Sequence, residues 1–221
     1  ATVPGTVLAS YMNIGAVPDP NFADNQLQIS ESFFLSDFWY RNEFIVTNPA
    51  DYVFLNFDGI NWKANVFLNG QKIGKIDGAF MRGKFDVSKQ IVKGKNAIAI
   101  QIIKNAHPGA IKEQTAYSTD QNGGIPGADN PTFHATIGWD WIPTIRGRNI
   151  GIWNDVFLTT TGKVTVADPL VKSVLPLPDT TSAKLTAEVI VKNHDANAVK
   201  GMLEGKIGDI TFQQPVELAA G

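Results

Sequence analysis

The fold is decided by the stretch Trp62-Lys63-Ala64-Asn65-Val66-Phe67-Leu68-Asn69-Gly70-Gln71-Lys72-Ile73-Gly74-Lys75-Ile76. Its first seven residues have the character of a β-strand. Asn69-Gly70 follows, and this dipeptide favours a type I′ turn because both central positions of that turn need positive φ. Gln71–Ile76 then returns as a second strand. The stretch therefore predicts an antiparallel β-hairpin.

Strand patterns continue on both sides of this hairpin. In Ala97–Ile103, the side chains of Ile98, Ile100 and Ile102 share one face at a period of two, which is typical of a strand packed on a core. We expect no helix of ten or more residues before residue 162. The other predicted strands of this part are 38–46, 52–57, 85–87 and 155–161. An antiparallel all-β sandwich is the predicted class.

The first 36 residues are punctuated by proline and glycine and carry little regular pattern. A short apolar stretch, Thr6–Met12, is compatible with one or two helical turns. We expect this lead-in to wrap the sandwich that follows it.

A domain boundary is predicted at Gly162-Lys163, because aromatic residues almost vanish beyond it. Lys184–Lys192 is a clear strand pattern, with Leu185, Ala187, Val189 and Val191 expected to face inward. Two further strands are expected at 200–207 and 210–216, and the spacing of the turns suits an immunoglobulin-like sandwich. Such a fold usually needs ~100 residues, so we expect residues 163–221 to form a truncated one with an unpaired edge open to self-association.

Three of the five tryptophans lie in Gly138-Trp139-Asp140-Trp141-Ile142-Pro143 and Gly151-Ile152-Trp153. Flat aromatic faces beside the carboxylate of Asp140 suit a sugar, whose C–H groups lie on the ring while its hydroxyls donate to the acid. Alternatively, the tryptophans pack between two sheets and Asp140 caps a turn. A long loop, residues 107–137, leads directly into this cluster, and long loops in compact domains are usually functional or disordered. Spacing alone leaves both interpretations open.

Composition excludes several classes of function. The formal net charge is −2, so no basic field attracts nucleic acid. No apolar run approaches the ~20 residues of a membrane span. The absence of cysteine rules out disulfides, thiolate metal sites and cysteine nucleophiles, and the three histidines are too far apart to predict a metal site. We expect no cofactor. The chain opens without methionine and reads as a processed product, and a cysteine-free chain is compatible with a periplasmic or secreted location.

Several separate blocks resemble, in order, the amino-terminal sugar-binding domain of family 2 glycoside hydrolases. The blocks are Phe38-Trp39-Tyr40-Arg41-Asn42-Glu43-Phe44, Leu55–Gly70, and the tryptophan blocks quoted above. Val3-Pro4-Gly5-Thr6-Val7, Val17-Pro18-Asp19-Pro20 and Trp141–Asn149 are most similar to the branch of β-mannosidases, endo-β-mannosidases and exo-β-glucosaminidases.

The resemblance implies a galactose-binding-like jelly-roll sandwich over residues 1–162, followed by the start of the immunoglobulin-like domain over 163–221. It also implies that Trp139 and Asp140 contact the terminal sugar in the active-site pocket, with Asp24 and Asn25 near the same pocket. The family places its two catalytic carboxylates on a later (β/α)₈ barrel, and such a barrel takes ~250 residues. We therefore expect no catalytic residue in this chain.

Two functions follow from the sequence. The chain is either a catalytically silent part of a glycosidase acting on β-mannosides or β-glucosaminides, which scaffolds the barrel and contributes to its sugar pocket, or a free-standing carbohydrate-binding module. A purely structural or protein-binding sandwich is a third interpretation. The sequence does not name the sugar, the linkage or exo against endo action.

Overall fold

A computed structural model describes residues 1–108, 110–111, 116–117, 124–125, 145–147 and 149–221. The chain divides into two compact units, which we describe separately. Unit 1 comprises residues 1–49 and 53–159, and unit 2 comprises residues 50–52 and 160–221. Both units are built of antiparallel strands in their described parts, so the prediction of an all-β protein is confirmed.

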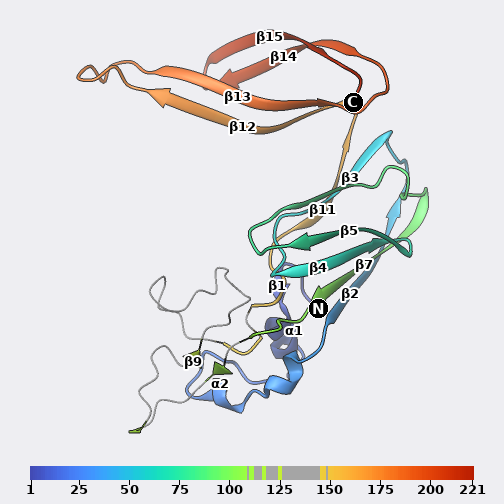
Figure 1. The fold of residues 1–221 in the computed structure, drawn as a ribbon, viewed down its shortest axis with the longest axis vertical. Helices are drawn as coiled ribbons and strands as arrows, with labels where there is room; N and C mark the ends of the chain where they lie inside the picture. Colours follow the sequence, from blue (N-terminus) through green and yellow to red (C-terminus); the bar gives the residue numbers. More distant parts are fainter. Residues whose placement is uncertain (109, 112–115, 118–123, 126–144, 148) are drawn as a thin grey trace. The chain divides into compact units, whose positions relative to one another are not determined.

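The main sheet of unit 1 has the strand order β2-β7-β4-β5, which is visible in Figure 1. Its strands are β2 (Phe38–Val46), β4 (Lys63–Leu68), β5 (Gln71–Asp77) and β7 (Gly94–Ile103). The hairpin of β4 and β5 turns at Asn69 and Gly70, with φ of 49° and 81°. The predicted turn is confirmed, because both residues have the positive φ that a type I′ turn requires.

A second sheet has the order β11-β3-β6 and faces the first one. Its strands are β3 (Tyr52–Phe57), β6 (Gly83–Asp86) and β11 (Val156–Thr161). A Cβ atom at Gly74 of β5 would lie 2.3 Å from the ring of Phe85 on β6, so this glycine lets the two sheets approach closely. Ile98, Ile100 and Ile102 are buried between the sheets, as the period of two predicted.

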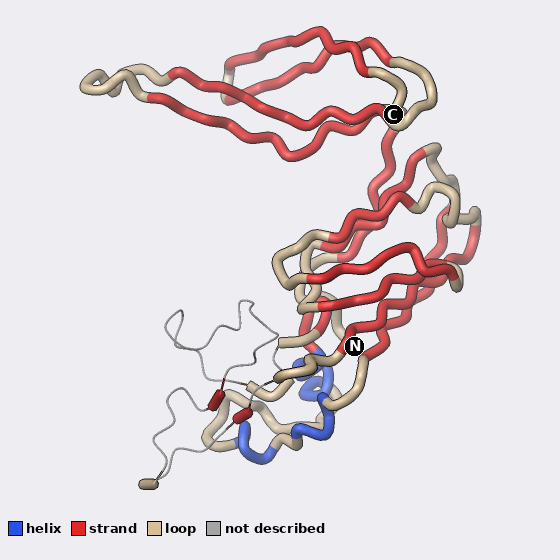
Figure 2. Tube along the Cα trace, in the orientation of Figure 1, coloured by secondary structure: helices blue, strands red, loops and turns tan. Residues whose placement is uncertain are grey.

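The lead-in of unit 1 holds short helices, which lie together at one end of the sheets in Figure 2. They are α1 (Val7–Asn13), α2 (Asn25–Gln28) and the 3₁₀ helix η1 (Glu31–Phe34). The helical turn predicted within Thr6–Met12 is confirmed, and the Thr6 hydroxyl caps α1 by accepting a hydrogen bond from the Ala9 amide. Among the described residues no helix is long and apolar enough to cross a membrane.

Unit 1 also contains two pairs of two-residue strands. β1 (Gly5–Thr6) pairs with β10 (Gly151–Ile152), and β8 (Ala110–Ile111) pairs with β9 (Gly124–Ile125). The β1–β10 pair ties the amino-terminal segment to the residues just before Trp153.

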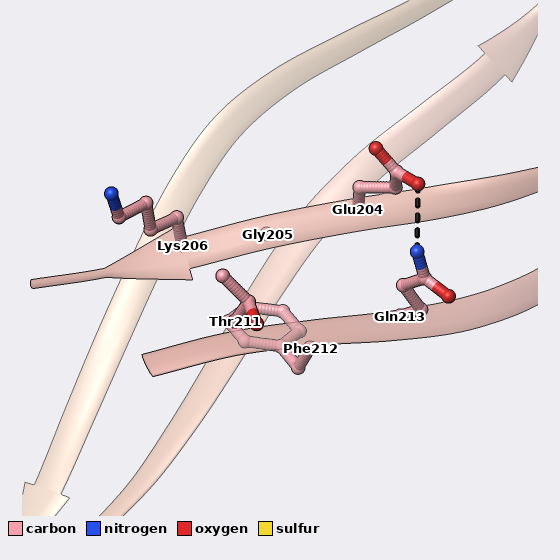
Figure 3. A pocket seen from close by; sticks show the side chains of 6 residues that line it. All are labelled: Glu204, Gly205, Lys206, Thr211, Phe212 and Gln213. Atoms are coloured by element: carbon pink, nitrogen blue, oxygen red, sulfur yellow. Dashed lines mark hydrogen bonds between the residues drawn. The ribbon is translucent and has the colours of Figure 1, made fainter. Parts of the chain in front are cut away.

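Unit 2 contains two antiparallel pairs, β12-β13 and β14-β15. Their bounds are Val164–Val174, Lys184–Asn193, Val199–Ile207 and Ile210–Leu218. On β14-β15 the ring of Phe212 lies over Gly205, and Gln213 donates a hydrogen bond to Glu204 at 2.8 Å (Figure 3).

The inward face predicted for β13 needs correction. Leu185 and Ala187 are exposed, whereas Val189 and Val191 are half-buried. The register places Val166 opposite Val191 and Val171 opposite Ala187, so the apolar face exists as predicted. Along β13 this face is therefore exposed at Leu185 and Ala187 and half-buried at Val189 and Val191.

Candidate functional site

The sugar-binding residues predicted from sequence fall in two segments of unit 1. Trp139 and Asp140 belong to residues 126–144, which lie outside the described residues. Asp24 and Asn25 are described and stand at the start of α2. The side chain of Asp24 is exposed and that of Asn25 is half-buried.

Asn25 is held by a turn that precedes it. Its side-chain amide donates a hydrogen bond to the carbonyl oxygen of Asp19 at 2.9 Å. The carboxylate of Asp19 in turn accepts from the backbone amide of Asn21 at 2.9 Å, the arrangement of an Asx-turn. The position of Asn25 is therefore fixed by local hydrogen bonds, while the Asp24 carboxylate makes a long contact of 3.5 Å with Gln28.

Arg146 joins this segment to the chain that follows Asp140. Its backbone amide donates to the side-chain oxygen of Gln26 at 3.2 Å, and its Nε donates to the Gln26 carbonyl oxygen at 3.1 Å. Its Nη1 donates to Glu31 at 2.5 Å. The Arg146 side chain is only 12% exposed, so these charge-assisted bonds form away from solvent, where they are stronger than at a surface.

Gly147, the residue after Arg146, belongs to the same junction between the lead-in helices and the chain that follows Asp140. Gly147 has φ of +80°, a left-handed conformation that glycine adopts without strain. A Cβ atom at this position would lie 2.8 Å from the ring of Phe34. Phe34 belongs to an aromatic cluster with Tyr11, Phe33 and Phe38, whose ring centroids are 5.1–6.4 Å apart. Arg146 and Gly147 therefore lie next to an aromatic cluster formed by the lead-in helices and the start of β2.

Strand β10, which follows Arg146 and Gly147, is held by backbone hydrogen bonds and by close packing of its neighbours. Asn61 and Gly151 exchange two backbone hydrogen bonds of 2.9 Å, and Asn61 is fully buried. Burial raises the pKa of Tyr40 above its ordinary value, although the neighbouring backbone of Ile152 opposes the shift. The ring of Trp153 lies against Gly59, where an added Cβ would approach it to 2.4 Å. For Trp153 this contact agrees with the packing interpretation of the tryptophan cluster, while Trp141 lies outside the described residues.

The comparisons with known proteins agree with this architecture. A family model described as glycosyl hydrolase 2 galactose-binding domain-like matches residues 1–154. The chain belongs to this family. The prediction made from the sequence blocks is confirmed at the level of the family.

Relatives of the chain carry the names of glycosidases. An exo-β-D-glucosaminidase from Streptomyces avermitilis is 30% identical over 219 residues, which are 97% of this chain and 22% of that protein. A mannosylglycoprotein endo-β-mannosidase from Lilium longiflorum is 36% identical over 174 residues, which are 76% of this chain and 18% of that protein. The crystal structure of an exo-chitosanase from Amycolatopsis orientalis superposes on the whole chain with a TM-score of 0.76 at 26% identity, and the match covers 24% of that enzyme. The chain therefore spans about a fifth to a quarter of the length of these relatives.

Three described carboxyl groups have a pKa below the ordinary value. Lys95 lowers the pKa of Glu43, Thr181 lowers that of Asp179, and Lys163 lowers that of Asp195 to about 2. Within the described residues, no group of three or more acidic or histidine side chains is arranged to hold a metal ion.

Sequence reasoning did not identify Arg146 and Glu31 as partners. The two residues are 115 positions apart, and neither stands in a recognisable motif with the other. The one local signal in the sequence is the basic Arg146-Gly147-Arg148 segment shortly after the tryptophan cluster.

Proposed function

We propose that the chain is the amino-terminal, non-catalytic part of a family 2 glycoside hydrolase that acts on β-mannosides or β-glucosaminides. In this proposal unit 1 supports a catalytic barrel located elsewhere in the protein and contributes Trp139 and Asp140 to the sugar pocket. Asp24 and Asn25 lie at the border of the same pocket. Unit 2 is the beginning of an immunoglobulin-like sandwich, with the domain boundary at residues 162 and 163.

The observation that carries the proposal is the set of hydrogen bonds made by Arg146. Arg146 follows Asp140 by six residues, and it binds Gln26 and Glu31. Gln26 is the next residue after Asn25. The contacts therefore support a site in which the two predicted segments face one sugar.

The names of the relatives support the substrate class. Both an exo-β-D-glucosaminidase and an endo-β-mannosidase match most of this chain. The matched parts are only 22% and 18% of these two relatives, which supports a function in which the reactive carboxylates reside in another domain. A periplasmic or secreted location is part of the same proposal and rests on the cysteine-free sequence.

Hydrolysis assays test the proposal. The purified 221-residue chain is expected to be inactive toward aryl β-mannosides and aryl β-glucosaminides. A steady rate that persists through repeated purification, and that disappears in an Asp140→Ala variant, would contradict it. The coding sequence beyond Gly221 offers a second test, because it is expected to encode a barrel of ~250 residues with two glutamates at strand ends.

The alternative is a free-standing carbohydrate-binding module. In that case the isolated chain binds monosaccharides such as mannose or glucosamine, and Asp140→Ala abolishes this binding. Titration calorimetry with both sugars separates the two functions. The proposed function expects no Asp140-dependent heat, since the pocket is complete only with the barrel.

A further inference from the structure

The outer face of the β2-β7-β4-β5 sheet carries an aromatic platform made by Trp39 and Phe67. Trp39 is on β2 and Phe67 on β4, and their ring centroids are 5.6 Å apart at an interplanar angle of 36°. The register aligns Arg41 of β2, Ala99 of β7 and Phe67 across the sheet, so the small side chain of Ala99 leaves the two rings room to meet. Trp39 is 58% exposed although it is held by Phe67. An indole that is both fixed and exposed presents a flat apolar surface to solvent.

A row of polar side chains runs beside this platform. The register places Trp39, Gln101 and Asn65 side by side on three adjacent strands. Asn65 donates from its amide nitrogen to the side-chain oxygen of Gln101 at 2.9 Å, and Gln101 donates to Asp37 at 2.8 Å. Asp37 also accepts from the backbone amide of Lys104 at 3.0 Å. The amide and carboxylate groups are therefore held in fixed directions next to the rings.

The dimensions and chemistry of this surface fit a sugar chain. Neighbouring strands are ~4.8 Å apart, so Trp39 and Asn65 are separated by roughly 10 Å across the sheet, which is about the length of a disaccharide. One pyranose ring stacks on the indole while the next one reaches the amides, the combination of apolar lining and few placed polar groups that is typical of small-ligand sites.

The charges around the platform favour a neutral ligand over a cationic one. The surrounding basic side chains on the outer face outnumber the acidic ones. The basic residues are Arg41, Lys63, Lys72, Lys75 and Lys95, and the acidic ones are Asp37, Glu43 and Asp77. A chain of protonated glucosamine would meet net repulsion there.

We propose that the Trp39–Phe67 platform is a second carbohydrate-binding surface, separate from the pocket of Trp139 and Asp140, and that it takes a neutral, β-linked pyranoside chain. In this proposal it holds a polymeric substrate to the outer face of the sheet. All the side chains that form this surface belong to described residues of unit 1.

Titration calorimetry of the 221-residue chain with mannohexaose tests the proposal. Saturable binding is expected, and Trp39→Ala is expected to weaken it about tenfold or more, equivalent to ~1.4 kcal/mol. Trp39→Phe retains a flat ring and is expected to keep part of the affinity. Phe80→Ala is the matched control, because Phe80 is an aromatic residue 68% exposed outside this sheet. The thermal unfolding midpoint of each variant verifies that the fold is kept.

The variant Asp140→Ala distinguishes sugar binding at this surface from sugar binding at the proposed active-site pocket. The proposal expects mannohexaose binding to survive Asp140→Ala. Binding that is lost in Asp140→Ala and kept in Trp39→Ala would overturn the platform and favour a free-standing pocket. Absence of saturable binding would also overturn it, while leaving the proposed function intact. A glucosamine hexamer is expected to bind more weakly than mannohexaose, and tighter binding would overturn the assignment of a neutral ligand.

Discussion

Arg146 donates a hydrogen bond to Glu31 across 115 residues of sequence, and this pair joins the lead-in helices to the chain that follows the tryptophan cluster. Glu31 begins the 3₁₀ helix η1, and its side chain is 35% exposed. Arg146 adds two bonds to Gln26 in α2. One side chain thus fixes both short helices, neither of which is long enough to be stable alone.

We expect Arg146→Ala to destabilise unit 1 by about 1–3 kcal/mol, because it removes the charge-assisted hydrogen bonds from this side chain to Glu31 and to the Gln26 carbonyl oxygen in a partly enclosed place. Residues 25–34 are expected to exchange amide hydrogens faster than in the wild type. Denaturant unfolding followed by tryptophan emission measures the first effect, and hydrogen exchange detected by mass spectrometry measures the second.

The matched control for this variant is Arg82→Ala. Arg82 and Asp58 form an exposed ion pair at 3.9 Å, and exposed pairs contribute about 0–1 kcal/mol. A loss of stability in Arg82→Ala as large as in Arg146→Ala would mean that the enclosed position of Arg146 has no special effect.

Gly59→Ala is expected to destabilise unit 1 by about 1–3 kcal/mol, because the new methyl group would overlap the indole of Trp153. Trp153→Phe provides the control, since a smaller ring leaves room for the methyl group. The double variant Gly59→Ala/Trp153→Phe is expected to be more stable than the sum of the single effects implies, and denaturant midpoints of all four proteins give this coupling. Strict additivity would show that the indole does not set the requirement for glycine.

The sheets of unit 1 were readable from the sequence because their signals are local. Asn69-Gly70 specifies a hairpin through its own φ angles, and the period of Ile98, Ile100 and Ile102 specifies a buried face. Strand β2 was predicted with the observed bounds of residues 38–46 for the same reason.

The junction at Arg146 and the platform at Trp39 were not readable, because each depends on the register between distant strands or helices. Trp39 and Phe67 meet only because Ala99 on the strand between them is small. The exposed face of β13 has a related cause. Periodicity identifies an apolar face, but it does not report whether another layer covers it.

The pair of Lys163 and Asp195 predicts how the stability of unit 2 depends on pH. Lys163 lies 2.8 Å from the Asp195 carboxylate and lowers its pKa from 3.8 to about 2, and the same contact raises the pKa of Lys163. A lowered carboxyl pKa stabilises the folded state above the ordinary value and ceases to do so as pH falls toward 2. The contribution of Lys163 to the stability of the folded state is present below the ordinary pKa of lysine. It is lost as pH rises through the raised pKa of Lys163.

We therefore expect unit 2 to open more readily as pH falls from about 4 to 2. In Asp195→Asn, which has no carboxyl group to titrate at this position, the increase in opening over the same pH range is expected to be smaller. Hydrogen exchange of the His194 amide, which donates to the Lys163 carbonyl at 2.8 Å, reports this opening. Comparing the wild type with Asp195→Asn at each pH removes the intrinsic dependence of exchange on pH. Lys163→Met is expected to lose the acid dependence as well. If the variants follow the wild-type profile, the pair does not control this region.

The exposed apolar face of β12 and β13 predicts self-association of the chain. Val166, Val171 and Leu185 on this face are 41–56% exposed, and Ala187 is exposed between them. Contiguous apolar surface of this kind usually marks an interaction site. We expect the sedimentation coefficient of the 221-residue chain to rise with protein concentration, and Leu185→Lys to suppress the rise by placing a charge within the contact.

The variant Ile190→Lys tests whether the association depends on this face of the strand pair or on the opposite face. Ile190 is 61% exposed on the opposite face of β13, beside the ion pair of Lys172 and Glu188. The same charge there is expected to leave the association unchanged, because the register directs Ile190 away from Leu185 and Val171. Equal suppression by both lysines would assign the association to general hydrophobicity or charge, and a chain that stays monomeric at all concentrations would show that the exposed face does not pair with a second copy of itself.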